Sequence, residues 1–243
     1  MHKWTICLLA VTFSYALSAQ ITDPVATEVW EPEPRKVTGV VAGAPPSDAI
    51  VLFDGKSARE WVHSADEREV EWTVADNALT VKAGAGEIKT RRTFGDFQLH
   101  VEFRTPAEVV GEGQGRGNSG VFLQGLYEVQ VLDSYNNRTY SNGQAGSIYK
   151  QTMPLVSATN PPGEWQAYDI VYTAPQFNAD GIKTRSAYVT VIHNGVVIQN
   201  HTEIKGTTEY IGLPKNAAHG KGPIKLQDHG NPVSYRNIWI REM

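Results

Sequence analysis

Two acids and an amide lie close together in the segment GNSGVFLQGLYEVQVLDSY, which covers residues 117–135. Glu128, Gln130 and Asp133 fall on, or just past, one predicted strand of a β-hairpin. Two carboxyl groups on one strand can act as general acid and general base if they converge on one bond of a substrate. Strand alternation places Glu128 and Gln130 on one face, and Val129 and Val131 on the other. The polar face is therefore either solvated surface or the floor of a cleft for a polar solute.

The spacing i, i+2, i+5 keeps all three polar side chains on one face only if a β-bulge lies between Gln130 and Asp133. Such a bulged array resembles that of laminarinase-type glycosidases, in which the middle position is an acid. Here the middle residue is Gln130, which cannot carry a charge. The alternative is a solvated strand face with Asp133 capping a turn.

The turn of this hairpin decides which residues face Glu128 across the ribbon. Glycine at position 125 predicts a two-residue turn over residues 125–126. That turn pairs Leu123 with Glu128 and Val121 with Gln130. Aliphatic neighbours raise the pKa of a carboxyl group when they also restrict solvent.

A histidine occupies a loop near the C-terminus, in the segment QDHGNP. Imidazole is the usual proton carrier near neutral pH, and loops on a rigid scaffold often carry functional groups. His229 is therefore a candidate acid or base. The alternative is a plain turn in which Asp228 and Asn231 hydrogen-bond to the backbone.

Other polar residues could contact a substrate. Arg104 and Glu102 share one face of the segment FQLHVEFR and could bind substrate hydroxyls or an enolate, or could simply pair across strands. Tyr149 and Lys150 follow a glycine in GSIYKQ, where they could line a cleft or belong to a solvated loop.

Metal and phosphate motifs are absent from the sequence. It contains no HxH, no HExxH and no cysteine pair, and GEGQGRG lacks the Lys-Ser/Thr of a phosphate-binding loop. The loop acids Asp133 and Asp228 could bind Ca²⁺, but their spacing defines no site. We predict no cofactor, although the sequence does not rule out a divalent cation.

The N-terminus has the features of an exported protein. Residues 1–19 combine a short basic start, an apolar stretch and a small-residue end, which predicts a signal peptide and a periplasmic or extracellular location. The one cysteine, Cys7, falls inside this segment. Residues 20–47 are rich in Pro, Ala, Gly and Val and predict an arm or linker. No later segment is long and apolar enough to span a membrane.

Charge and patterning point to an all-β protein that does not bind nucleic acid. The net charge is −4, and no run of Lys or Arg exceeds two residues. The segment at residues 97–104 alternates apolar and polar side chains without exception, and Asn194-Gly195 is a strong hairpin signal. Further strands are expected near residues 49–53, 72–74, 78–81, 165–172, 186–193, 196–200, 224–227 and 235–240. This pattern predicts a two-sheet β-sandwich or jelly roll.

The chain resembles the bacterial 3-keto-disaccharide hydrolase (3-keto-glycoside hydrolase) family. LFDG, GNSGVFLQGLYEVQVLDSY, PPGEWQAYDIVY, VIHNGVVIQNH and PIKLQDHGNPVSYRNIWIR carry the resemblance over about residues 50–242. The resemblance implies a concanavalin A-like lectin/glucanase domain over residues 48–243. It also implies an exported enzyme that acts on glycosides already oxidised to a ketone at C3 by a partner sugar 3-dehydrogenase.

Such an enzyme needs a base to remove the C2 hydrogen, an acid for the leaving group and a donor for the enolate oxygen. On this resemblance the acid and base are expected among Glu128, His229 and Asp133. The residues expected to bind the hydroxyl groups and the enolate are Arg104, Asn118, Gln130, Lys150, Gln227 and Arg236.

Two other functions fit the same residues. A carbohydrate-binding module would retain a glycan unchanged, because fold alone does not fix function. An ordinary glycosidase would cleave glycans that have not been oxidised.

Overall fold

The computed structural model describes residues 22–39 and 43–243. The chain divides into two units, one reaching to Val37 and the other beginning at Thr38. Within the first unit, Pro24–Thr27 forms a single 3-10 turn, η1, whose N-cap Asp23 accepts a hydrogen bond from the Val25 amide. The predicted signal peptide, residues 1–19, lies outside the described residues.

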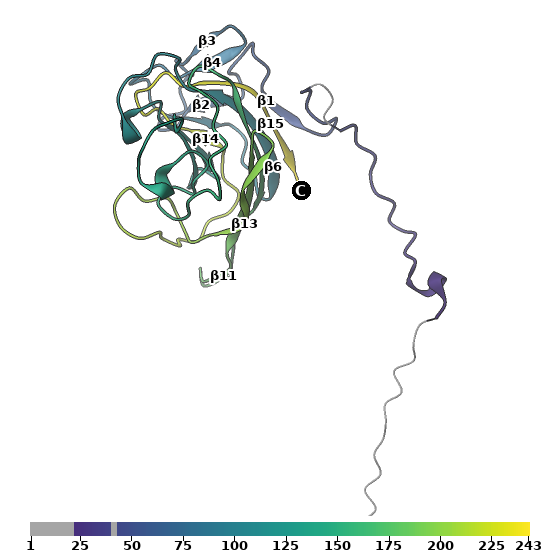
Figure 1. The fold of residues 1–243 in the computed structure, drawn as a ribbon. Helices are drawn as coiled ribbons and strands as arrows, with labels where there is room; N and C mark the ends of the chain where they lie inside the picture. The colour runs from purple at the N-terminus through teal and green to yellow at the C-terminus, as the bar shows by residue number, and fades with distance from the viewer. Residues whose placement is uncertain (1–21, 40–42) are drawn as a thin grey trace, which may run out of the picture. The chain divides into compact units, whose positions relative to one another are not determined.

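The second unit is built from antiparallel β-sheets (Figure 1). The larger sheet has the order β13-β12-β9-β6-β15-β4-β3, and β1 also pairs with β15. Its strands are β1 (Ile50–Phe53), β3 (Thr73–Ala75), β4 (Ala78–Thr80), β6 (Phe97–Arg104), β9 (Gln166–Thr173), β12 (Ala187–His193), β13 (Val196–Ile204) and β15 (Ser234–Glu242).

A five-stranded sheet, with the order β2-β5-β14-β7-β8, forms the second layer. Its strands are β2 (Trp61–His63), β5 (Ile88–Thr90), β7 (Ser119–Leu123), β8 (Tyr127–Val131) and β14 (Lys225–Leu226). A small ribbon joins β10 (Gln176–Phe177) to β11 (Lys183–Arg185), and two further 3-10 turns are η2 (Gly113–Gly115) and η3 (Ser141–Gly143). The described residues contain no α-helix, and among them no helix has the length and apolar character needed to cross a bilayer.

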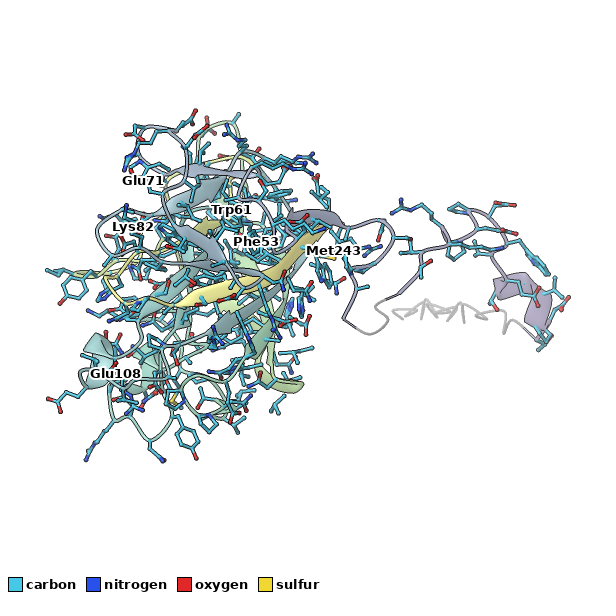
Figure 2. All side chains as sticks on the ribbon, turned by 90° about the horizontal axis from the view of Figure 1, so that it is seen from above. Phe53, Trp61, Glu71, Lys82, Glu108 and Met243 are labelled. Carbon is cyan, nitrogen blue, oxygen red and sulfur yellow. The ribbon has the colours of Figure 1, made fainter. Side chains whose placement is uncertain are left out.

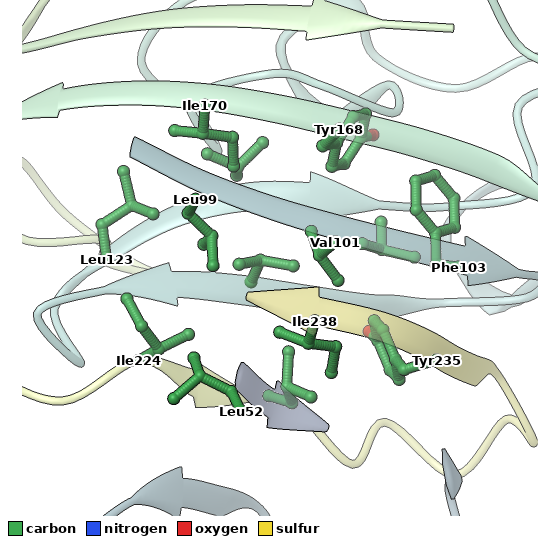
Figure 3. Close-up of a cluster of buried hydrophobic side chains, with 14 of the residues drawn as sticks. Leu52, Leu99, Val101, Phe103, Leu123, Tyr168, Ile170, Ile224, Tyr235 and Ile238 are labelled. Carbon is green, nitrogen blue, oxygen red and sulfur yellow. The ribbon is translucent and has the colours of Figure 1, made fainter. Parts of the chain in front are cut away.

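The core lies between these two sheets, as Figure 3 shows. In β6, the side chains of Leu99, Val101 and Phe103 point inward and are at most 1% exposed, as their alternation predicts. Leu123 of β7 meets them from the opposite sheet. Fully burying a side chain of this size contributes roughly 1.5–3 kcal/mol. The all-β, two-sheet sandwich predicted from the sequence is confirmed.

Side chains along the edge of the sandwich divide in the same way (Figure 2). Phe53 and Trp61 are buried, and the Trp61 indole N–H donates to the Leu52 carbonyl at 2.8 Å. Glu71 and Lys82 are exposed and form an ion pair at 3.3 Å. Apolar side chains thus fill the interior while charges remain in water.

The turn between β7 and β8 differs from the predicted one. Gln124 and Gly125 both have positive φ, and the Leu126 amide donates to the Leu123 carbonyl. The buried Gln124 side chain fixes this geometry, because its amide donates to the Phe94 carbonyl and accepts from the Tyr172 hydroxyl. The turn predicted over residues 125–126 is therefore wrong.

The new turn shifts the register of the ribbon. Glu128 lies opposite Phe122, and Gln130 lies opposite Gly120. Glu128 therefore faces an aromatic ring rather than the aliphatic side chain of Leu123. The two outward-facing pairs together form the floor on which the candidate site is built.

Candidate functional site

A cavity of about 640 Å³ opens on the outer face of the five-stranded sheet, away from the core. This volume lies within the range of small-molecule sites. The cavity is lined by Gln114, Gly115, Asn118, Phe122, Glu128, Gln130, Tyr140, Tyr149, Lys150, Thr208, Tyr210, Gln227 and His229. Six of the nine predicted site residues are among them: Asn118, Glu128, Gln130, Lys150, Gln227 and His229.

Glu128 is the most buried ionisable group of this cavity. It is 4% exposed, and burial raises its pKa to about 8. Lys225 acts in the opposite direction, but its ammonium group is bound to Glu87 at 2.8 Å and lies 4.0 Å from the Phe122 ring centroid. A carboxyl group with this pKa can hold a proton at neutral pH and give it up during a reaction.

Gly120 makes room for this carboxyl group. A Cβ atom built on Gly120 would lie 2.4 Å from Glu128 Oε1 and 3.0 Å from the Phe122 ring. Because Gly120 stands opposite Gln130 on the same outer face, any side chain here would enter the cavity floor. The glycine therefore serves close packing of Glu128 over the backbone of β7.

Two loops cover the free edge of β8 and wall the cavity. The Tyr149 amide donates to the Glu128 carbonyl at 3.1 Å, and the Glu128 amide donates to the Thr208 hydroxyl at 2.9 Å. Ile148 bridges to Val129. These bonds satisfy a strand edge that would otherwise be unpaired.

The wall itself is aromatic and cationic. The Tyr140 and Tyr149 hydroxyls are hydrogen-bonded at 2.6 Å. The Lys150 ammonium donates to the Tyr210 carbonyl at 2.5 Å and lies 4.3 Å from the Tyr210 ring centroid. Tyrosine rings with polar edges suit a ligand that has both C–H faces and hydroxyl groups. Of the two interpretations of Tyr149 and Lys150, the structure supports cleft-lining residues.

The loop that carries His229 is anchored on both sides of the histidine. Asp228 accepts hydrogen bonds from the Gly86 and Gly230 amides, each at 2.9 Å. Asn231 accepts from the Asn118 amide at 2.8 Å. The backbone bonds expected of a plain turn are therefore present, and they also hold the exposed His229 at the cavity.

Two amides complete the floor beside His229. The Asn118 side chain donates to the Gln114 carbonyl at 2.7 Å. The Oε1 atom of Gln227 is buried and has no hydrogen-bond partner among the described residues. A buried acceptor without a partner is costly, so a donor supplied by a ligand would be well placed here.

Asp133 does not join Glu128 in the cavity. β8 ends at Val131, no bulge brings Asp133 back to the outer face, and its carboxylate accepts from Arg116 Nε at 2.6 Å. Its other oxygen accepts from the Tyr135 amide at 3.2 Å. The expectation that Asp133 converges with Glu128 and Gln130 is wrong, because its ion pair with Arg116 holds the carboxylate outside the cavity.

Arg104 and Arg236 lie on the other sheet, on the face opposite to its buried side. Both guanidinium groups stack on Trp165, at 4.7 and 4.1 Å from its ring centroid. Arg236 also donates to Glu102 at 2.5 Å. The core separates this face from the cavity, so neither arginine lines it. Glu102 therefore pairs across strands with Arg236, as the alternative interpretation expected.

Several charged side chains surround Glu102 on the same outer face. His100 bonds to Asp169 at 2.7 Å and lies 3.7 Å from Glu102. Although burial acts against it, hydrogen bonding to these carboxylates raises the pKa of His100 to about 9. The same histidine is the largest factor lowering the pKa of Glu102, to about 2. These charges neutralise one another across the strands.

Several lining residues were not predicted: Gln114, Gly115, Phe122, Tyr140, Thr208 and Tyr210. All except Phe122 come from loops or 3-10 turns, where no periodicity marks a face. Phe122 could have been found, because alternation along β7 places it on the same side as Gly120. In the described part of the chain, no group of three or more His, Cys, Asp or Glu is arranged to hold a metal ion.

Comparison with known proteins identifies the family of the chain. A family model described as a 3-keto-alpha-glucoside-1,2-lyase-like domain matches residues 48–241. A Bacteroides thetaiotaomicron protein named 3-keto-disaccharide hydrolase is 25% identical over 247 aligned residues, which cover 79% of this chain and 77% of that protein.

Solved structures give the same picture of the fold. A Parabacteroides distasonis protein, described as a candidate glycosyl hydrolase, is 53% identical, with a TM-score of 0.88 over 96% of this chain and all of that one. A second protein of that organism and description is 24% identical, with a TM-score of 0.56 over 80% of this chain and 99% of its own. The second likeness shows the fold alone.

Proposed function

Because the chain belongs to the 3-keto-alpha-glucoside-1,2-lyase-like family, we propose that it cleaves glycosides whose sugar carries a ketone at C3. The name of the Bacteroides thetaiotaomicron relative specifies a 3-keto-disaccharide, and we extend this substrate class to the present chain. The family description refers to a 1,2-lyase, which fits a reaction that begins by elimination across C1 and C2.

One observation carries the choice of elimination over direct hydrolysis. Among the described residues that line the cavity, Glu128 is the sole carboxylic acid. Ordinary glycoside hydrolysis requires two carboxyl groups that flank the scissile bond. Asp133, which could have been the second, is bound to Arg116 outside the cavity. A cavity with one carboxyl group and one imidazole suits a reaction that needs one acid and one base.

The C3 ketone makes this chemistry accessible. It acidifies the C2 hydrogen, so a base can take that proton while the C2–H electron pair forms the C2=C3 double bond of an enolate. The enolate then re-forms the ketone and expels the C1 substituent, and the leaving oxygen takes a proton from an acid. Water adds at C1 of the resulting enone, C2 regains a proton, and the net change is hydrolysis.

The cavity supplies groups for each step. Glu128 and His229 form the acid–base pair, and Lys150 can stabilise the enolate oxygen as a cation. Asn118 and Gln227 bind hydroxyl groups, and the buried Gln227 Oε1 offers an acceptor that has no partner among the described residues. The wall of Tyr140, Tyr149 and Tyr210 packs against the C–H faces of the sugar.

The test compares two substrates that differ only in oxidation state. The protein is incubated with a 3-keto-disaccharide and with the same disaccharide before oxidation, and released sugars are measured by chromatography. Release from the ketone alone supports the proposal. Release from the unoxidised sugar would identify an ordinary glycosidase. Retention of an intact glycan, with no release from either, would identify a binding module.

Export and supply of the substrate belong to the same proposal. We expect residues 1–19 to be removed during export, so that the mature protein begins at Gln20; N-terminal sequencing of the secreted protein tests this. The substrate requires prior oxidation of a C3 hydroxyl, so a sugar 3-dehydrogenase must act first. Deleting such a dehydrogenase should remove the substrate from cells, whereas addition of the ketone should restore turnover.

A further inference from the structure

A directed chain of amide groups stands behind Glu128. Gln130 Nε2 donates to Gln114 Oε1 at 3.0 Å. Gln114 Nε2 in turn donates to the Gly143 carbonyl at 2.9 Å and to the Thr139 hydroxyl at 3.1 Å. Because the Gln114 nitrogen is engaged with these two oxygens, Gln114 presents its oxygen to Gln130. These hydrogen bonds therefore all run in one direction, from Gln130 through Gln114 to the Gly143 carbonyl.

This direction decides which atom of the Gln130 amide lies next to the Glu128 carboxyl group. With the Gln130 nitrogen on Gln114, the Gln130 oxygen lies 2.9 Å from Glu128 Oε1 and 3.2 Å from the Ser119 carbonyl. Two oxygens at 2.9 Å repel each other unless one carries a proton. A protonated Glu128 resolves the shorter of the two contacts, because its O–H group then donates to the Gln130 oxygen. The contact with the Ser119 carbonyl at 3.2 Å remains.

The reverse orientation of Gln130 suits the ionised acid instead. Its nitrogen then donates to Glu128 Oε1 at 2.9 Å and to the Ser119 carbonyl at 3.2 Å, while its oxygen lies 3.0 Å from Gln114 Oε1. Turning Gln114 as well would bring its oxygen against the Gly143 carbonyl. Each orientation of the Gln130 amide thus matches one protonation state of Glu128 and leaves one oxygen–oxygen contact, at 3.2 Å to Ser119 or at 3.0 Å to Gln114. The shorter contact with the anchored Gln114, and the Asn118 oxygen 3.5 Å from the Gln130 nitrogen, favour the orientation that matches the protonated acid.

The charges around Glu128 do not oppose this preference. Lys225 on β14 favours the carboxylate, but Glu87, which precedes β5, disfavours it and is bound to that lysine at 2.8 Å. The phenol groups of Tyr149 and Tyr235 interact electrostatically with Glu128 but are neutral, since burial raises the pKa of each. Burial is the largest influence on Glu128 itself, and it also favours the proton.

Lys150 and His229, the remaining basic groups of the cavity, come from loops at its wall. The Lys150 ammonium is already bound to the Tyr210 carbonyl at 2.5 Å. His229 is exposed, in the loop between β14 and β15. The imidazole is therefore open to a bound substrate, whereas the Glu128 oxygens are held against Gln130.

We propose that Glu128 is the acid of the reaction, that His229 is the base, and that Gln130 and Gln114 are positioning residues which hold the acid proton until it is transferred. This assignment rests on the proposed function.

The reaction then proceeds in four proton transfers. His229 takes the C2 proton and the C1–O bond breaks. The electron pair of that bond stays on the leaving oxygen, which takes the Glu128 proton. Reversal of the Gln130 amide then gives the new carboxylate an N–H donor. Water entering at C1 returns a proton to Glu128, and His229 returns one to C2.

The first experiment separates acid from base by isotope exchange in D₂O, followed by NMR on a 3-keto-glucoside. Glu128→Gln should keep exchange at C2, because His229 is intact, yet lose release of a sugar leaving group by about 100-fold or more. His229→Gln should lose exchange down to the enzyme-free rate. Loss of exchange in Glu128→Gln, or its retention in His229→Gln, would overturn the assignment. Absence of turnover by the unaltered protein would instead refute the proposed function.

The second experiment tests the positioning role through the leaving group. Acid assistance matters for a sugar leaving group and little for 4-nitrophenol, which leaves readily without a proton. Gln130→Met should lower kcat/KM at least 10-fold for a 3-keto-disaccharide and less than about 3-fold for the 3-keto-4-nitrophenyl glucoside. Equal losses would indicate a merely structural role and overturn the proposal. Gln98→Met, on the outer face of β6, is the matched control and should change neither substrate.

Discussion

The Glu128→Gln variant should be more stable than the unaltered protein, and increasingly so as the pH rises. Glutamine keeps the shape of the buried side chain and removes its ionisation. In the folded protein burial raises the pKa of Glu128 from 4.5 to about 8. A raised folded-state pKa means that the native state binds the proton more tightly than the unfolded chain does. The stabilising contribution is therefore complete below pH 4.5 and is lost as the pH rises towards 8.

The size of the effect follows from the same shift. Each pH unit between the two pKa values costs about 1.4 kcal/mol of stability. The unaltered protein should thus lose about 3 kcal/mol by pH 7, and about 5 kcal/mol above pH 8, which glutamine at this position avoids. The Gln130 oxygen can accept from the new amide N–H, so the substitution leaves no buried acceptor unpaired.

Urea unfolding at pH 5, 6, 7 and 8 measures this directly, from the difference in free energy of unfolding between variant and parent. Glu69→Gln, at an exposed position, is the matched control and should show no such trend. A difference that stays constant from pH 5 to pH 8 would refute the reasoning, because it would mean that Glu128 is already ionised at the lowest pH or is not shielded from water.

Three further variants test the geometry of the site. Gly120→Ala should displace the Glu128 carboxyl group, lowering kcat/KM at least 10-fold and stability by about 1–3 kcal/mol; unchanged kinetics would mean that the carboxyl group has room to spare. Asp133→Asn should cost about 3 kcal/mol in a denaturant titration by breaking the pair with Arg116, yet keep kcat in the folded fraction; loss of kcat in folded protein would restore Asp133 to a catalytic role. Arg104→Ala should leave kcat/KM within about twofold and cost under about 1 kcal/mol, and a rise in KM would place the substrate on the outer face of the large sheet.

Strands that carry their own periodicity could be read from the sequence. The alternation of residues 97–104 defines both faces of β6, and the positive-φ pair Asn194-Gly195 closes the hairpin of β12 and β13. The strands β2 and β5 were not predicted. Each has only three residues, so its strand character depends on the partner it pairs with rather than on local pattern.

The turn of the central hairpin shows why local rules fail. A glycine at position 125 fits a two-residue turn over residues 125–126, but Gln124 adopts positive φ instead. Its side chain is held by Phe94 and Tyr172, which lie about 30 and 48 positions away in the chain. No local signal reports such distant partners, and the resulting register change moved Glu128 opposite Phe122.

The candidate site could be predicted in part for the same reason. Glu128, Gln130 and His229 could be found because strand alternation and a turn-bounded loop mark them. Alternation could not reveal which sheet carries the hollow, so Arg104, on an equally polar face, remained a candidate. The prediction for Asp133 was wrong because its partner Arg116 comes from a loop with no pattern of its own.

The central claim is that a cavity with a single carboxyl group cleaves a keto-glycoside by elimination and rehydration. Cleavage of a 3-keto-disaccharide in D₂O, stopped early and examined by NMR, tests it most directly. Deuterium should appear at C2 of the released keto-sugar, well above an enzyme-free sample, because the exposed His229 exchanges the abstracted proton with solvent before it returns one to C2. Release of a product that keeps its original hydrogen at C2 would contradict the claim, because direct displacement at C1 never breaks that bond.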